Sequence, residues 1–194
     1  MSALIPLVEE VLACTLCAPH LPLGPRPVLQ VGRKARLLII GQAPSLTVHN
    51  TGVLWNDMSG DRLRDWLQLD KEVFYDPSQV ALMGMGFCYP GRGKSGDLPP
   101  RPECAPQWHE RLLNELPNVQ LTLLIGQYAQ QYYLADGYRT LTERLLHWRS
   151  FPEQLFALPH PSPRNRHWLA KNPWFNDEVL PELRRRCHAL LAKK

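Results

Sequence analysis

Four cysteines with regular spacing are the residues of this sequence best suited to bind a metal. Cys14 and Cys17 form a Cys-x2-Cys pair, and Cys88 and Cys104 are separated by fifteen residues. Such a pair clamps a soft metal, and two further thiolates complete four ligands. The spacing does not separate zinc from an iron–sulfur cluster. The alternative is that they are small buried apolar side chains, which is what we expect of Cys187 on the apolar stripe of the last helix.

A cationic, proline-rich stretch follows the last apolar run of the chain. Residues 158–175 are too polar for a core strand and too interrupted by proline for a helix. Arg164, with Arg166 and Lys171, suits contact with phosphate groups, and so do Ser162 and nearby backbone N–H groups. The alternative is an ordinary solvated basic loop.

A second cationic loop is rich in glycine. The run "GRGKSG" contains Arg92 and Lys94 but lacks the G-x4-G-K-[ST] spacing, which argues against a nucleotide-triphosphate site. The net charge of +4 and the pI of about 8.9 are compatible with a polyanionic partner.

Apolar runs alternate with amphipathic ones along the chain. Because strands that alternate with helices favour a parallel sheet covered on both faces, the chain is predicted to be α/β. Loops after the strands should then meet at one edge of the sheet. The expected strands are residues 35–41, 80–87, 119–126 and 154–160, and the expected helices are 4–13, 59–69 with Ser59 as N-cap, 105–116, and 176–192 capped by Asn176 or Asp177.

The sequence predicts one domain over residues 1–194. It shows no internal repeat, no secretory signal and no run near the roughly 18 apolar residues of a membrane span. We therefore expect a cytoplasmic monomer without disulfides.

Five features in order give the sequence a family resemblance. They are the Cys-x2-Cys pair, "GQAPS" at residues 41–45, "WNDMSG" at 55–60, the Cys88 and Cys104 pair, and "HPSPRN" at 160–165. Together they resemble the uracil-DNA glycosylase superfamily in its iron–sulfur branch, families 4 and 5.

The resemblance implies a three-layer α/β/α sandwich around a four-stranded, mostly parallel sheet. It implies that the four cysteines hold a [4Fe–4S] cluster, with zinc as the alternative. The implied activity is that of a monofunctional DNA glycosylase, which hydrolyses the N-glycosidic bond of uracil or a related deaminated base in DNA. Two alternatives remain: a non-catalytic iron–sulfur DNA-binding protein of the same fold, and a zinc-stabilised protein with an unrelated small-molecule pocket.

The chemistry of base excision assigns roles to particular residues. A base must leave the stack before its glycosidic bond can be reached. Trp55 or Phe87 would stack on the extruded base, and Asp57 would orient water or stabilise the sugar cation. His160 would donate a hydrogen bond to the negative charge that grows on the departing base. The alternatives are a surface or capping role for Asp57 and a core role for Trp55.

The remaining assignments place residues around the base and the DNA. Gly41, Gln42, Ala43 and Asn165 belong to the loops expected to bind the base. Ser162, Arg92 and Lys94 are expected to contact DNA phosphates, and Arg164 or a neighbour would fill the gap left by the base.

Two positions depart from the family pattern. Gln42 stands where family 4 has a glutamate, and it cannot act as a base. Gly84 stands where many relatives have an asparagine that reads the uracil edge. These departures put the identity of the base in question and leave Asp57 as the candidate carboxylate.

Overall fold

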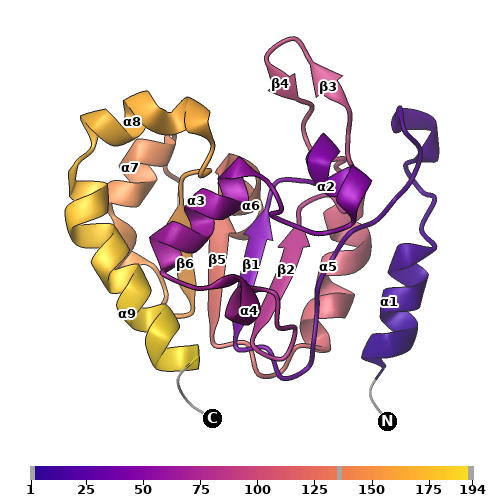
Figure 1. The fold of residues 1–194 in the computed structure, drawn as a ribbon, viewed down its shortest axis with the longest axis horizontal. Helices are drawn as coiled ribbons and strands as arrows, with labels where there is room; N and C mark the ends of the chain where they lie inside the picture. Colours follow the sequence, from indigo (N-terminus) through magenta and orange to yellow (C-terminus); the bar gives the residue numbers. More distant parts are fainter. Residues whose placement is uncertain (1–2, 135–136, 192–194) are drawn as a thin grey trace.

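A computed structural model describes residues 3–134 and 137–191 of the chain. Its centre is a sheet of four parallel strands in the order β2-β1-β5-β6, shown in Figure 1. These strands are β1 (Leu37–Gly41), β2 (Val80–Gly84), β5 (Leu121–Ile125) and β6 (Leu155–Leu158).

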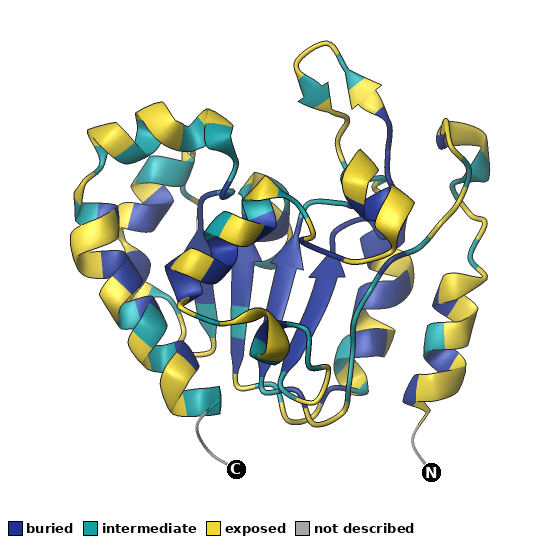
Figure 2. Cartoon of the chain, in the orientation of Figure 1, coloured by how far each residue is buried: buried dark blue, intermediate teal, exposed yellow. Residues whose placement is uncertain are grey.

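The sheet is apolar on both faces, as expected for parallel strands covered by helices. Every residue of β1 and β2 is buried, and the sheet is the most buried part of the fold in Figure 2. One face packs against helices α3 (Met58–Leu67) and α9 (Leu180–Leu191). The other face packs against α1 (Leu4–Leu12), α5 (Cys104–Asn114), α6 (Gln127–Tyr133) and α7 (Leu141–Leu146). The fold is therefore the expected three-layer α/β/α sandwich.

Shorter elements surround the carboxyl ends of the strands. The hairpin of β3 (Arg92–Gly93) and β4 (Gly96–Asp97), α2 (Leu46–Thr51) and α8 (Arg166–Lys171) all lie at that end of the molecule in Figure 1. The opposite end carries α4 (Lys71–Phe74). In the described ranges, no helix has the length and apolar character needed to cross a membrane.

The expected strands and helices are present, with changes at their ends. The expected cap of the last helix at Asn176 or Asp177 is wrong, because a π-helical turn (Phe175–Val179) precedes α9. The N–H groups of Asn176 and Asp177 donate to the Pro173 carbonyl, so the helical turn begins before them. Cys187 is fully buried in the core, as expected.

Candidate active site

A cavity of about 530 Å³ lies at the carboxyl ends of the strands. Its walls come from four segments: residues 41–46 after β1, residues 54–59 at the start of α3, the hairpin region after β2, and residues 160–165 after β6. Parallel strands end at a common edge, which brings these distant segments together. Gly41, Gln42 and Ala43, the residues predicted to bind the base, line the cavity.

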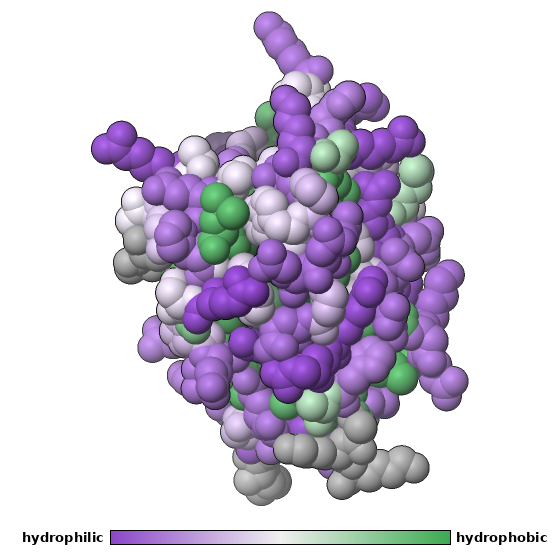
Figure 3. All heavy atoms as spheres, turned by 90° about the vertical axis from the view of Figure 1, so that its left-hand side faces the viewer, coloured by the Kyte–Doolittle hydropathy of each residue, from purple (hydrophilic) through white to green (hydrophobic). Residues whose placement is uncertain are grey.

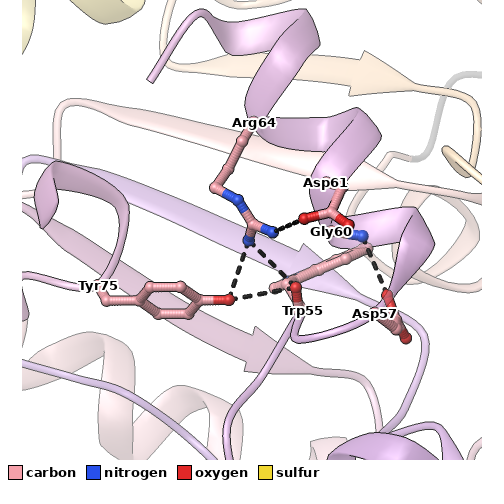
Figure 4. Close-up of polar contacts among 6 residues, drawn as sticks. All are labelled: Trp55, Asp57, Gly60, Asp61, Arg64 and Tyr75. Atoms are coloured by element: carbon pink, nitrogen blue, oxygen red, sulfur yellow. Dashed lines mark hydrogen bonds and ion pairs between the residues drawn. The ribbon is translucent and has the colours of Figure 1, made fainter. Parts of the chain in front are cut away.

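Asp57 is fixed in the cavity wall by two hydrogen bonds. Its Oδ1 accepts from the Gly60 N–H at 3.0 Å, and its Oδ2 accepts from the Ser45 hydroxyl at 2.9 Å; Figure 4 shows the first. Asp57 is thus the N-cap of α3, and the expected cap at Ser59 is wrong because Ser59 already lies within the first turn. The same carboxylate caps the helix and faces the cavity.

Trp55 belongs both to the core and to the cavity wall. Its φ is +58°, a left-handed conformation that costs energy in a residue other than glycine. Arg64 Nη1–H and the Tyr75 hydroxyl donate to the Trp55 carbonyl at 3.1 and 3.2 Å and hold this conformation (Figure 4). A Cβ at Gly60 would lie 1.6 Å from that carbonyl oxygen, and a Cβ at Gly41 would lie 2.7 Å from the indole ring. Both glycines are therefore required by the position of Trp55.

His160 enters the cavity from the end of β6. Its ring lies 5.8 Å from that of Trp55. Burial lowers the pKa of His160, and the nearby charge of Asp57 opposes this only in part, so the imidazole is neutral at pH 7. Asn165 lines the cavity, but its Nδ2 donates to the His160 carbonyl at 2.6 Å. The Asn165 amide thus fixes the loop that carries His160. Gly126 follows β5, and its loop was also expected at this edge; it lies beside His160 and is not part of the cavity wall.

Arg164 connects two loops across the cavity. Its guanidinium donates to the Ser95 carbonyl in the turn of the β3–β4 hairpin. Arg92 and Asp97 of that hairpin also line the cavity, whereas Lys94 is exposed and outside it. Burial raises the pKa of Asp97, and the charges of Arg164 and Arg92 oppose that rise. The two cationic loops therefore face one cavity.

Ser162 uses its hydroxyl to shape its own loop. Its Oγ accepts from the Arg164 N–H at 3.2 Å and caps a 3-10 turn (Pro163–Asn165). The Ser162 carbonyl accepts from Arg62 of α3 at 3.1 Å. On the other side of the cavity, Gln42 Nε2 donates weakly to the Leu98 carbonyl at 3.4 Å.

Helix α8 continues the cationic surface beyond this loop. Arg166, His167 and Lys171 are exposed. The side of the molecule that carries α8 and α9 is mainly hydrophilic, with small separate apolar patches (Figure 3). Arg166 and Lys171, which were predicted to add positive charge here, are therefore accessible to solvent.

Phe87 was predicted as a possible stacking residue for a base, and this placement is wrong. Its side chain is 1% exposed, lies outside the cavity and stacks on His109 at 5.6 Å. His109 Nε2–H donates to the Gly84 carbonyl at 3.0 Å, and its Nδ1 accepts from the Tyr133 hydroxyl at 2.5 Å. Phe87 instead packs behind the cavity wall, with its N–H donating to the Cys104 sulfur at 3.4 Å.

The four spaced cysteines line a second, smaller pocket behind the cavity. Cys14 and Cys17 come from the N-terminal segment, Cys88 from the loop after β2, and Cys104 from the first turn of α5. Cys187 lies elsewhere, on the buried face of α9. Burial raises the pKa of Cys88 to about 11 and that of Cys104 to about 12, so both thiols are protonated at pH 7 unless a cation binds them.

These thiols share a pocket without meeting at a single point. Among residues 3–134 and 137–191, no three His, Cys, Asp or Glu side chains are grouped closely enough to hold one metal ion. Glu103 approaches the Cys17 sulfur at 3.9 Å and is itself paired with Arg101. The donor set is therefore four thiols with one acidic neighbour.

The architecture defines the class of the protein: a parallel α/β/α domain whose single sheet edge gathers a carboxylate, an imidazole and an indole around one cavity. A family model described as the Uracil DNA glycosylase superfamily matches residues 29–184. The chain belongs to this superfamily, whose members act as glycosylases on DNA.

Several residues of the cavity were not anticipated from the sequence. Tyr89 and Asp97 line it, and Ser45 fixes Asp57. Ser45 also caps α2, with the Val48 N–H donating to its Oγ at 3.3 Å. A serine immediately before an apolar run is an N-cap signal, and it would have marked Ser45. No comparable sequence signal marks Tyr89.

Proposed function

We propose that the protein hydrolyses the N-glycosidic bond of uracil or a related deaminated base in DNA, and that it belongs to the iron–sulfur branch of its superfamily. The observation that carries this proposal is the cavity itself. It places the fixed carboxylate of Asp57, the neutral imidazole of His160 and the indole of Trp55 around one space at the edge of the sheet.

The reaction separates charge, and Asp57 and His160 can each stabilise one of the two charges. As the bond breaks, the sugar becomes cationic and the base becomes anionic. Asp57 faces the cavity as an acceptor that can orient water towards the sugar or stabilise its positive charge. Its two hydrogen bonds hold it in place before substrate arrives, which is the preorganisation that electrostatic catalysis requires.

His160 serves the departing base as a hydrogen-bond donor. Because burial lowers the pKa of His160, the ring is a neutral donor at pH 7. A neutral donor stabilises an oxyanion on the base without first transferring a proton to it. Trp55 supplies an apolar surface for the base beside this donor.

The recognition of the base differs from that of relatives with an asparagine at position 84. A Cβ at Gly84 would lie 2.4 Å from the Gly86 carbonyl oxygen, so this backbone has no room for a side chain there. Gln42 lines the same cavity, and its amide carries both N–H donors and a carbonyl acceptor. We assign to Gln42 the role of forming hydrogen bonds with the N–H and C=O groups that uracil shares with other deaminated bases.

The cysteine pocket and the spacing of its four cysteines support an iron–sulfur cluster. A [4Fe–4S] cluster binds four thiolates, each through a different iron. The four thiols that line this one pocket are such a ligand set. Cys14, Cys17, Cys88 and Cys104 would hold the cluster, which would cross-link the N-terminal segment to α5 and to the loop after β2.

A single-turnover assay of base release tests the function. Duplex and single-stranded oligonucleotides would each carry one uracil, hypoxanthine or xanthine, and heating in alkali would reveal abasic sites. We expect release of at least one of these bases, and the loss of release in His160→Ala.

A second function is favoured by Gln42, which has no charge where family 4 has a glutamate. If the protein, loaded with its cluster, binds these oligonucleotides but releases none of the bases, it is a non-catalytic DNA-binding protein. The enzymatic proposal then fails.

A further inference from the structure

Exposed apolar side chains lie in the segments that form the cavity wall or next to them in the sequence. Leu46, Val53, Met58 and Leu98 expose 46%, 40%, 70% and 43% of their surface. Leu46 lines the cavity, and Leu98 lies at the base of the hairpin, where its carbonyl accepts from Gln42. Met58 is the most exposed of the four, although nothing in the fold requires a long apolar side chain there.

The position of Met58 at the cavity rim is fixed by its neighbours. Asp57 and Ser59 on either side of it both line the cavity, and Met58 is the first residue of α3. The cap by Asp57 makes this turn rigid. Met58 shares a face of α3 with Arg62, four residues on, and Arg62 donates to the Ser162 carbonyl. Met58 therefore lies on the face of α3 that meets the loop following β6.

The loop after β6 does not leave Arg164 free for insertion into DNA. The Arg164 guanidinium donates to the Ser95 carbonyl and lies against Gly96, so it is directed towards the hairpin. The expectation that Arg164 fills the gap left by an extruded base therefore needs this contact to break. Met58 makes no such contact and carries a flexible, apolar thioether.

We propose that Met58 is the wedge that enters the DNA stack where the target base has left it. This inference rests on the proposed function, which places Asp57 beside the sugar of the extruded nucleotide. Consecutive Cα atoms are about 3.8 Å apart, so Met58 then lies next to the vacated position in the strand. Methionine is among the apolar side chains that proteins insert between base steps.

The test compares duplex with single-stranded substrate, because only the duplex has a stack to fill. For the base that the wild type releases, Met58→Ala should slow single-turnover release from duplex DNA by about tenfold and leave release from single-stranded DNA unchanged. Met58→Leu, which keeps an apolar side chain of similar size, should retain most of the duplex rate. Ile5→Ala removes a side chain on α1 that is 71% exposed and lies away from the cavity, and it should change neither rate.

Two results would overturn the inference while leaving the function intact. One is an unchanged duplex rate in Met58→Ala, and the other is an equal loss on both substrates, which would indicate a structural role. If the wild type releases no base, the proposed function is wrong. Extrusion of the base from the duplex can then be measured by fluorescence. A 2-aminopurine placed beside the modified base should then brighten when wild-type protein binds the duplex and brighten less with Met58→Ala; equal brightening would reject the wedge.

Discussion

Asp57 has two separable tasks, and substitutions can measure them independently. Asp57→Asn keeps an oxygen that accepts from Gly60 N–H, and asparagine is as good an N-cap as aspartate. Asp57→Ala removes the cap and also leaves the Ser45 hydroxyl without its acceptor. We therefore expect Asp57→Asn to change the free energy of unfolding by only a few tenths of a kcal/mol, and Asp57→Ala to lower it by about 1–2 kcal/mol.

The rate should respond differently. Both variants remove the negative charge that faces the cavity, so both should slow single-turnover base release by about a hundredfold, equivalent to about 2.7 kcal/mol. Asp70 offers a matched control, because it caps α4 by accepting from the Val73 N–H at 2.8 Å and lies outside the cavity. Asp70→Ala should cost about 1 kcal/mol of stability and leave the rate unchanged.

The measurements are urea unfolding and base release at saturating enzyme. Full activity in Asp57→Asn would refute the catalytic role of the carboxylate. Equal stability of Asp57→Asn and Asp57→Ala would refute the assignment of the cap.

Three further predictions concern the metal, the DNA and the pH. Anaerobically purified protein should contain about four irons per chain, and elemental analysis should find iron lost in Cys17→Ser but kept in Cys187→Ser; one zinc per chain would exclude the cluster. Binding of a duplex, measured by fluorescence anisotropy, should weaken with salt, and Arg164→Ala should weaken it more than Arg185→Ala on the far part of α9; equal effects would place the contact elsewhere. Burial lowers the pKa of His109 from 6.5 to about 4, so the unfolded state binds the extra proton first as the pH falls. Between pH 6.5 and 4, the free energy of unfolding should therefore fall further in the wild type than in His109→Gln, by up to about 3 kcal/mol. Parallel curves of unfolding free energy against pH for the two proteins would contradict this.

The sequence predicted the layers and the edge at which the site lies, because both depend on local patterns. Buried apolar runs identify parallel strands, and parallel strands place the loops that follow them at one edge. Gln42 and His160 follow strands and lie in the cavity for this reason, whereas Trp55 and Asp57 were placed there by the family resemblance. The four spaced cysteines line one pocket.

The errors arose where tertiary contacts decide the outcome. Ser59 has the residue type of an N-cap, but the position is taken by Asp57, whose backbone is extended and whose other oxygen is held by Ser45. Phe87 follows a strand like the cavity residues do, yet the chain turns at Gly84 and buries the ring against His109. No local pattern of Arg164 specifies its contact with Ser95, which lies 69 residues away in the chain.

The loop after β2 passes between the cavity and the cysteine pocket. Met83, Gly84 and Tyr89 line the cavity, whereas residues 86–88 line the cysteine pocket. An insertion or deletion of one residue in this segment would displace both walls at once. Evolution can therefore change base preference at this wall only by substitutions that preserve its length, and variation in the length of the protein must be accommodated elsewhere, for example in the β3–β4 hairpin.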